Sequence, residues 1–127
     1  MAIKISGTTI ISDSRNLDYY GEEYYDNSNT GSSCTINLQN GNFQRAVLNS
    51  NCTFTFSNPT NGATSFTLVL YNDGTAGRSI TWPTSVKWPN GSTPVRTTSA
   101  NKADVYTFFT YDGGTSWWGV LSLYNFS

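Results

Sequence analysis

Short β-prone segments, separated by glycine-containing turns at nearly regular intervals, constrain the fold of this chain most. Apolar and polar residues alternate with a period of two in the segments 35–38, 52–56 and 105–109, as they do along strands with one buried face. Pairs that tolerate the positive φ of tight turns separate the segments: Asn40-Gly41, Asn61-Gly62, Asp73-Gly74, Asn90-Gly91 and Asp112-Gly113. No window repeats apolar residues at helical spacing. The pattern predicts an all-β protein built as an antiparallel β-sandwich of the jelly-roll type.

The N-terminal part of the chain follows a different pattern. Isoleucines at positions 3, 5, 10 and 11 can form one or two short strands, but residues 18–33 contain no regular apolar pattern. We therefore expect an extended N-terminal arm over residues 1–31 and the β-sandwich over residues 32–127. The Asp112-Gly113 turn, between Phe109 and Trp117, predicts a hairpin whose two strands close the sandwich.

Charge is scarce in this sequence. Only 12% of the residues are charged, against about a quarter in typical soluble domains, whereas 15% are aromatic. A surface poor in Lys and Glu suits an assembled particle or an adhesive binding face, although ordinary all-β composition accounts for it equally well. The net charge of −1 gives a nucleic-acid partner no electrostatic basis.

The sequence also bears on the compartment in which the chain folds. It has no apolar run long enough to span a bilayer, and its N-terminus lacks a signal-peptide core, so we expect no membrane insertion and folding in a cytoplasm. In that compartment Cys34 and Cys52 are expected as reduced thiols, and the sequence leaves open whether they pair.

The residues give no basis for catalysis. The chain has no histidine, which removes the commonest general base and metal ligand, and its two cysteines do not form a CxxC motif. In the expected sandwich Asp73 and Asp112 precede glycine and are interpreted as turn caps. Asp104 is interpreted as a surface partner of Lys102 or Arg96. We therefore expect no enzyme, no metal site and no cofactor.

The aromatic residues are the better candidates for binding. Trp88, Trp117 and Trp118 lie in the C-terminal half, and exposed tryptophans stack on sugar rings or anchor interfaces. Trp117 and Trp118 are adjacent, so on a strand they point to opposite faces and one of them must face solvent or a ligand. The alternative is that these side chains fill the core of a small domain.

A second candidate site is an acidic, tyrosine-rich strip between Asp18 and Asp26. Its members combine amphipathic rings with negative charge: Tyr19, Tyr20, Glu22, Glu23, Tyr24 and Tyr25. We expect this docking strip to lie against a basic, partly apolar surface of a neighbouring subunit or another protein, with a solvated linker as the alternative.

Two stretches of the chain resemble proteins of tailed-phage virion surfaces, of the marine or cyanobacterial phage type. The first is ISGTTIISDSRNL over residues 5–17, and the second runs from Asn58 to Trp117 through the pairs Trp82-Pro83 and Trp88-Pro89. Small β-domains with such patterns occur in tail fibres and capsid decorations, are typically trimeric and carry no catalytic residues in the pattern.

The resemblance implies a non-enzymatic structural protein of the virion, assembled in the host cytoplasm. Fibres usually carry a long shaft that is absent here, so the expected protein is a short surface fibre or a capsid decoration subunit, and the sequence does not distinguish them. It would form a homotrimer, dock on other virion proteins by its N-terminal arm and contact the host surface. The competing class is a carbohydrate-binding module that uses exposed Trp and Tyr side chains.

Overall fold

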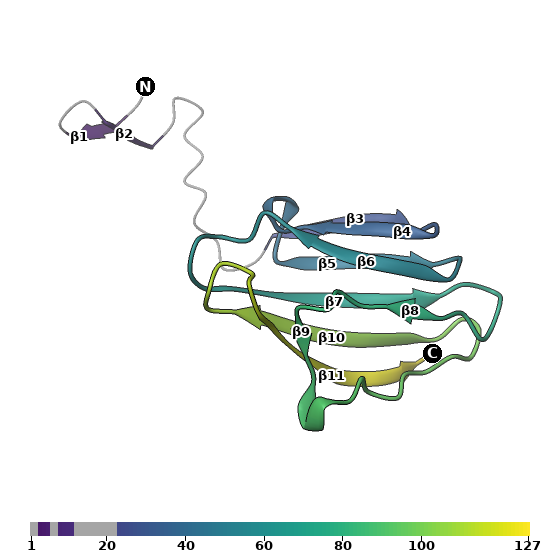
Figure 1. The fold of residues 1–127 in the computed structure, drawn as a ribbon. Helices are drawn as coiled ribbons and strands as arrows, with labels where there is room; N and C mark the ends of the chain where they lie inside the picture. The colour runs from purple at the N-terminus through teal and green to yellow at the C-terminus, as the bar shows by residue number, and fades with distance from the viewer. Residues whose placement is uncertain (1–2, 6–7, 12–22) are drawn as a thin grey trace.

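The computed structural model describes residues 3–5, 8–11 and 23–127, and these form an all-β protein (Figure 1). The strands are β1 Ile3–Ile5, β2 Thr8–Ile11, β3 Tyr24–Asn29, β4 Ser33–Asn37, β5 Phe43–Leu48, β6 Cys52–Ser57, β7 Thr64–Asn72, β8 Ile80–Thr81, β9 Val86–Lys87, β10 Ala103–Thr110 and β11 Trp117–Phe126, with the short 3-10 segments η1 Leu38–Asn40 and η2 Pro89–Gly91.

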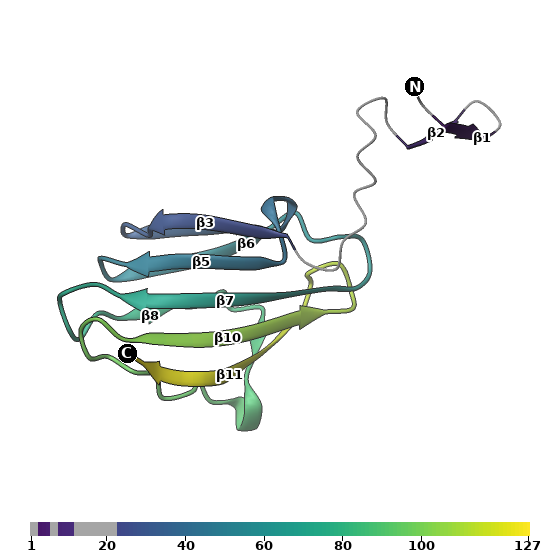
Figure 2. The ribbon, with the colours of Figure 1, turned by 180° about the vertical axis from the view of Figure 1, so that it is seen from behind.

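Two sheets pack face to face. The larger sheet has the strand order β3-β5-β7-β10-β11-β9, and the smaller sheet has the order β4-β6-β8. Figure 2 looks onto the larger sheet, with the smaller one behind it. Strands β1 and β2 form a separate two-stranded sheet. The predicted all-β sandwich is confirmed.

The chain from β3 to β8 winds as three successive rungs, and each rung contributes one strand to each sheet. Strands β3, β5 and β7 pair in parallel in the larger sheet, with Tyr24 beside Phe43 and Phe43 beside Thr67. Strands β4, β6 and β8 pair in parallel in the smaller sheet. We call this part, residues 24–81, the wound half.

The remainder, residues 82–127, is the hairpin half. Strands β10 and β11 form an antiparallel hairpin, and β10 extends the larger sheet by pairing antiparallel with β7. The short strand β9 pairs in parallel with the start of β11, where Val86 lies beside Trp117. The predicted hairpin between Phe109 and Trp117 is therefore present.

The strand pairing corrects the expected antiparallel jelly roll, because five of the eight strand pairs are parallel. The turns at Asn40-Gly41 and Asp73-Gly74 lie where the expected breaks lie, but they join one sheet to the other instead of joining neighbouring strands. A turn residue sets the local φ, and it does not determine whether the next strand returns to the same sheet or crosses to the facing one.

The start of the sandwich also differs from the expected boundary. β3 pairs with β5 in the larger sheet, so residues 24–29 belong to the sandwich and not to the arm. β3 is an edge strand whose side chains are nearly all exposed, and Ser28 adopts a positive φ of 58° where the pairing is interrupted. A polar, irregular edge protects a sheet from further pairing, and it also removes the apolar alternation that reveals a strand.

The core between the sheets is aromatic. Phe54, Phe66, Phe108 and Trp117 are buried, and the ring of Phe56 lies about 5 Å from those of Phe66 and Phe108. Leucine, isoleucine and cysteine side chains from both sheets complete the core. The buried edge-to-face rings stabilise the sandwich both by burying apolar surface and by their own pairing.

A buried glutamine fixes the crossing from β4 to β5. The side-chain amide of Gln44 donates to the carbonyls of Asn37 and Gly41, each at 2.8 Å, and its oxygen accepts from Asn27 at 3.0 Å. Gly41 has a φ of 147°, and a Cβ there would lie 2.1 Å from the carbonyl oxygen of Glu23. This corner therefore requires glycine.

Candidate ligand pocket and aromatic surface

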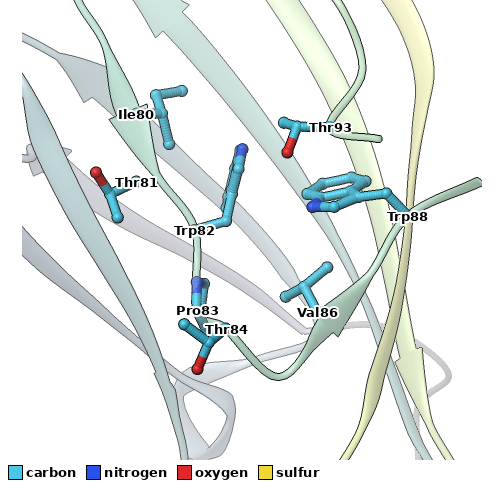
Figure 3. Close-up of a pocket in the computed structure, with 8 residues that line it drawn as sticks. All are labelled: Ile80, Thr81, Trp82, Pro83, Thr84, Val86, Trp88 and Thr93. Carbon is cyan, nitrogen blue, oxygen red and sulfur yellow. The ribbon is translucent and has the colours of Figure 1, made fainter. Parts of the chain in front are cut away.

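The tryptophans of the two Trp-Pro pairs, Trp82 and Trp88, line a pocket in the sandwich (Figure 3). The pocket has a volume of about 360 Å³, and we call it the Trp-Pro pocket. Its lining residues are Ile80, Thr81, Trp82, Pro83, Thr84, Val86, Trp88 and Thr93. They come from β8, β9 and the segments that follow each of these strands.

Proline sets the local backbone of the pocket. A residue before proline is held in the extended region, and Trp88 has the corresponding φ of −106° and ψ of 154°. The amide of Val86 donates to the carbonyl of Pro83 at 3.1 Å, which closes the turn between the two tryptophans. The turn brings the two indoles to a centroid distance of 5.7 Å.

The two tryptophans are supported from opposite sides. Trp82 is buried and stacks on Phe54, with centroids 5.1 Å apart and planes at 19°. Trp88 is half-buried and lies against Gly119, where an added Cβ would approach its ring to 2.9 Å. Gly119 therefore gives Trp88 room to pack closely on β11.

The chemistry of the pocket is neutral. None of its eight lining residues carries a charge, and three of them are threonines. Figure 3 shows the indoles of Trp82 and Trp88 on two sides of the hollow, with Thr93 between them. Indole faces and edges offer apolar contact, and hydroxyl groups both donate and accept hydrogen bonds. This set suits an uncharged ligand that has both C–H faces and hydroxyl groups.

The three tryptophans predicted for glycan binding are separated by the structure. Trp88 lines the pocket. Trp117 is 2% exposed and belongs to the core, so its predicted glycan role is wrong. Trp118 is 37% exposed and points away from Trp117, as expected for adjacent residues on a strand. The sequence could not show which of the two faces inward. Trp82, which no predicted site included, lines the pocket beside Trp88.

Trp118 belongs to an exposed aromatic row on the larger sheet. Its ring lies nearly parallel to those of Phe109 and Tyr111, with centroids 6.2 Å apart in both cases. The ammonium group of Lys87 lies 5.3 Å from the centre of the Trp118 ring, within the range of a cation–π contact. This row points away from the core that Trp117 enters.

The docking strip is described only in part. Tyr19, Tyr20 and Glu22 lie outside the described residues. Glu23 is exposed, and its amide donates to the side-chain oxygen of Asn42 at 2.8 Å. Tyr24 and Tyr25 begin β3 and are 57% and 40% exposed. The docking role of the strip therefore stays a prediction.

The aspartates of the sandwich hold the backbone in place. Asp73 accepts from the amide of Thr75 at 3.0 Å, and Asp112 accepts from that of Ser116 at 2.9 Å, so both turn caps are confirmed. Bonds to the guanidinium of Arg78 lower the pKa of Asp73, and the Ser116 amide lowers the pKa of Asp112.

The structure does not place Asp104 in the expected surface pair with Lys102 or Arg96. It is buried, and its two oxygens accept from the amides of Thr97 at 2.8 Å and Asn125 at 3.0 Å. It thereby fastens the loop before β10 and the end of β11. A buried carboxylate is stabilised by such backbone donors, which a sequence does not reveal.

Three further observations concern metal binding, membrane crossing and the thiols. Among the residues it describes, no three His, Cys, Asp or Glu side chains are grouped to hold a metal ion. Within the same residues, no helix has the length and apolar character needed to cross a membrane. Cys34 and Cys52 are buried and carry free thiols, and burial raises the pKa of Cys34 to about 11.

Comparison with known protein families gives a match. Residues 27–116 match the family described as "Putative phage tail fibre C-terminal domain", and the matched range spans strands β4 to β10 and the Trp-Pro pocket. No curated protein and no solved structure matches the chain. The chain belongs to this family of phage tail fibre C-terminal domains, and it is a structural, fibre-type component of the virion.

Proposed function

We propose that this protein is the surface-exposed, non-enzymatic binding subunit of a short phage fibre, and that it takes an uncharged sugar of the host surface in the Trp-Pro pocket. The N-terminal arm attaches it to other virion proteins. The family match favours a fibre over a capsid decoration.

The neutral, indole-walled pocket carries this proposal. A sugar presents C–H faces to aromatic rings and hydroxyl groups to side chains such as Thr84 and Thr93, both of which line the pocket. Neither a carboxylate nor a basic group is present among the lining residues, so an acidic sugar would find no charged partner there. The pocket volume of about 360 Å³ accommodates a small saccharide.

A non-enzymatic role agrees with the state of the aspartates. Hydrolysis of a glycoside needs two carboxyl groups that face one cleft. Asp73, Asp104 and Asp112 instead accept hydrogen bonds from backbone amides in three separate places. None of them lines the pocket.

Binding can be tested with an array of uncharged mono- and oligosaccharides and two matched variants. Trp88→Leu removes one indole wall and should weaken binding about tenfold, as expected for the loss of one aromatic contact. Trp118→Leu makes the same change outside the pocket and should leave binding within about twofold. The opposite ranking would move the sugar site to the exposed row, and no binding by the unchanged protein would end the proposal.

A further variant distinguishes loss of the pocket from loss of folding. Thr93 is exposed at the pocket, so Thr93→Phe fills the hollow without disturbing the core. It should abolish sugar binding while the thermal unfolding temperature stays unchanged. Retained affinity in a folded Thr93→Phe protein would contradict the pocket as the site.

The arm proposal rests on the docking strip. The strip holds tyrosines and acids, and exposed ion pairs contribute little, so the rings should supply most of the affinity. Replacing Tyr19, Tyr20, Tyr24 and Tyr25 with serine should therefore weaken incorporation into the particle more than replacing Glu22 and Glu23 with glutamine. Incorporation measured on purified particles checks this, and the reverse order would contradict the docking role of the strip.

A further inference from the structure

A second hollow lies beyond the Trp-Pro pocket along the same stretch of chain. It has a volume of about 260 Å³ and is lined by residues 95–99 together with Tyr124 and Asn125. We call it the Tyr124 pocket. Its residues come from the loop between η2 and β10 and from the end of β11. None of them lines the Trp-Pro pocket, so the proposed sugar site does not yet include them.

The two pockets are neighbours along one extended segment. Thr93 lines the Trp-Pro pocket, and Val95 lines the Tyr124 pocket. Thr93 precedes Pro94, which favours an extended backbone, and residues 93–98 contain no turn or bend. Residues two apart in an extended segment point to the same side, and the side chains of Thr93 and Val95 are both exposed. The two pockets therefore open side by side.

Strand β11 sets the combined length of the two pockets. Trp88 lies against Gly119 near the start of β11, and Tyr124 lies near the end of that strand. A strand rises about 3.4 Å per residue, so the stretch from Gly119 to Tyr124 spans about 17 Å, the length of about three linked sugar units. The volumes of about 360 and 260 Å³ together fall within the range of common ligand sites, which the smaller pocket alone does not reach.

The side chains of the Tyr124 pocket suit a ligand with C–H faces and hydroxyl groups. The Tyr124 side chain is 68% exposed, so its ring is accessible to an apolar surface of a ligand. The hydroxyls of Thr98 and Ser99 are exposed, and neither bonds to a residue that the structure describes. Both hydroxyls can therefore donate to and accept from a ligand.

The backbone that carries these side chains is held in place. The side-chain amide of Asn72 donates to the carbonyls of Thr97 at 3.0 Å and Ser99 at 2.8 Å. The Asp104 carboxylate accepts from the amides of Thr97 and Asn125, and it thereby joins the loop to the end of β11. A site that is ordered before binding loses less conformational entropy when the ligand binds.

The charges around the Tyr124 pocket favour an uncharged ligand. Arg96 is the charged lining residue, and its guanidinium donates to the carbonyl of Arg78 at 2.9 Å and to the side-chain oxygen of Asn72. Asp104 is buried and accepts from the amide of Thr97, the residue next to Arg96, so a negative charge lies near this positive one. The opposite charges give an anionic sugar little advantage, in agreement with the neutral Trp-Pro pocket.

We infer that the Tyr124 pocket is a second subsite of the proposed sugar site, so that the ligand is an uncharged oligosaccharide and not a single sugar. One unit lies against Trp88, the chain passes over Pro94, and a further unit stacks on Tyr124. This inference rests on the proposed function, because the Trp-Pro pocket anchors the saccharide.

Titration of saccharides of increasing length tests the inference in the full chain. The probes are series of one to six units of glucose, mannose, galactose or N-acetylglucosamine, and calorimetry measures their affinity. In the series that binds, the affinity should rise about tenfold from one unit to four, as expected for one added aromatic contact, and should then stay constant. An affinity that does not depend on length would overturn the inference and leave the proposed function intact.

Two tyrosines provide a matched pair of variants. Tyr124 and Tyr111 are 68% and 65% exposed, and Tyr111 lines neither pocket. Tyr124→Ser should lower the affinity for the four-unit saccharide about tenfold and leave that for the single sugar within about twofold. Tyr111→Ser should change neither affinity, whereas Trp88→Leu should weaken both. Equal behaviour of the two tyrosine variants would contradict the second subsite. No binding of any saccharide to the unchanged protein would end the proposed function and this inference with it.

Nuclear magnetic resonance gives a second readout that needs no variant. The amide signals of Thr98 and Ser99 should shift with the four-unit saccharide and not with the single sugar. The indole N–H signal of Trp88 should shift with both ligands, because both occupy the Trp-Pro pocket. If the signals of Thr98 and Ser99 stay unchanged with the four-unit saccharide while that of Trp88 shifts, the chain does not reach the Tyr124 pocket and the inference is wrong.

Discussion

The wound half and the hairpin half of this sandwich connect their strands in different ways. In the wound half each rung crosses from one sheet to the other, so its geometry depends on the corners, such as Gly41 with its buried neighbour Gln44. In the hairpin half β10 and β11 run antiparallel, and their side chains, with β9, support both the Trp-Pro pocket and the exposed aromatic row that contains Trp118. Under the proposed function, the wound half serves mainly as scaffold, and the hairpin half supplies six of the eight residues that line the proposed sugar site.

A single methyl group at the β4–β5 corner should have the largest effect on the wound half. In Gly41→Ala the new Cβ would lie 2.1 Å from the backbone oxygen of Glu23, which no side-chain rotation can relieve. The free energy of unfolding should fall by more than about 4 kcal/mol, which is much of the stability of a small domain. Urea unfolding measures it.

Gly31→Ala is the matched control for that corner. Gly31 also has a positive φ, 62°, but no atom lies within 4 Å of its added Cβ. Gly31→Ala should lower the free energy of unfolding by about 1–2 kcal/mol, which is the cost of holding a residue with a Cβ at a positive φ. Equal losses of unfolding free energy in the two variants would mean that the close contact between Gly41 and Glu23 does not limit the stability of the wound half.

A methyl group in the hairpin half should have a smaller effect on stability and a clear effect on binding. In Gly119→Ala the added Cβ approaches ring atoms of Phe108 and Trp88 to 2.9 Å, and side chains can shift where backbone cannot. Overpacking of this kind costs about 1–3 kcal/mol. Because Trp88 must move, sugar affinity should fall as well. Gly74→Ala, with nothing within 4 Å, should change neither stability nor affinity.

The two halves also differ in how far the sequence predicts them. Strand positions, turn positions and the β10–β11 hairpin follow from period-two alternation and Asx-Gly pairs, which are local signals. The parallel winding does not follow from local signals, because the Asn40-Gly41 turn is compatible with either a hairpin or a crossing to the other sheet. β3 is hidden by its exposed, polar edge position, and the inward orientation of Trp117 depends on a register that sequence spacing leaves undetermined.

The thiols of the wound half provide a test at alkaline pH. Burial raises the pKa of Cys34 to about 11, above its unfolded value, and raises that of Cys52 as well. A raised folded pKa contributes stability that is fully present below the unfolded pKa and is lost as pH rises towards the folded pKa. Thermal stability should therefore fall between about pH 9 and pH 11. Cys34→Ala should flatten that fall relative to the unchanged protein.

Accessibility of the same thiols gives a kinetic check. At pH 8 the folded protein should react with iodoacetamide at least about a hundredfold more slowly than after unfolding in urea, because the thiolate is the reactive form. Fast labelling of the folded protein would show that the wound half opens under native conditions.

The smallest expected effect compares one aspartate from each half at acid pH. Hydrogen bonds lower the pKa of Asp73 at the β7–β8 corner and that of Asp112 in the β10–β11 hairpin. A lowered folded pKa contributes stability above the unfolded value, and that contribution is lost as pH falls below about 4 through the folded pKa. Asparagine keeps an accepting oxygen but does not titrate, so either substitution should reduce the fall of the unfolding temperature at acid pH.

Asp112→Asn should leave the unfolding temperature at pH 7 unchanged, because the partners of Asp112 are the Thr110 hydroxyl and the Ser116 amide. Asp73→Asn should lower that temperature slightly, since Arg78 loses its ion pair at 2.9 Å. Asp112 is exposed and Asp73 is only partly buried, so the shifts should be small, and they should shrink further in high salt for Asp73 alone. A salt-dependent shift in Asp112→Asn would show that the hairpin turn relies on charge and not on its backbone bonds.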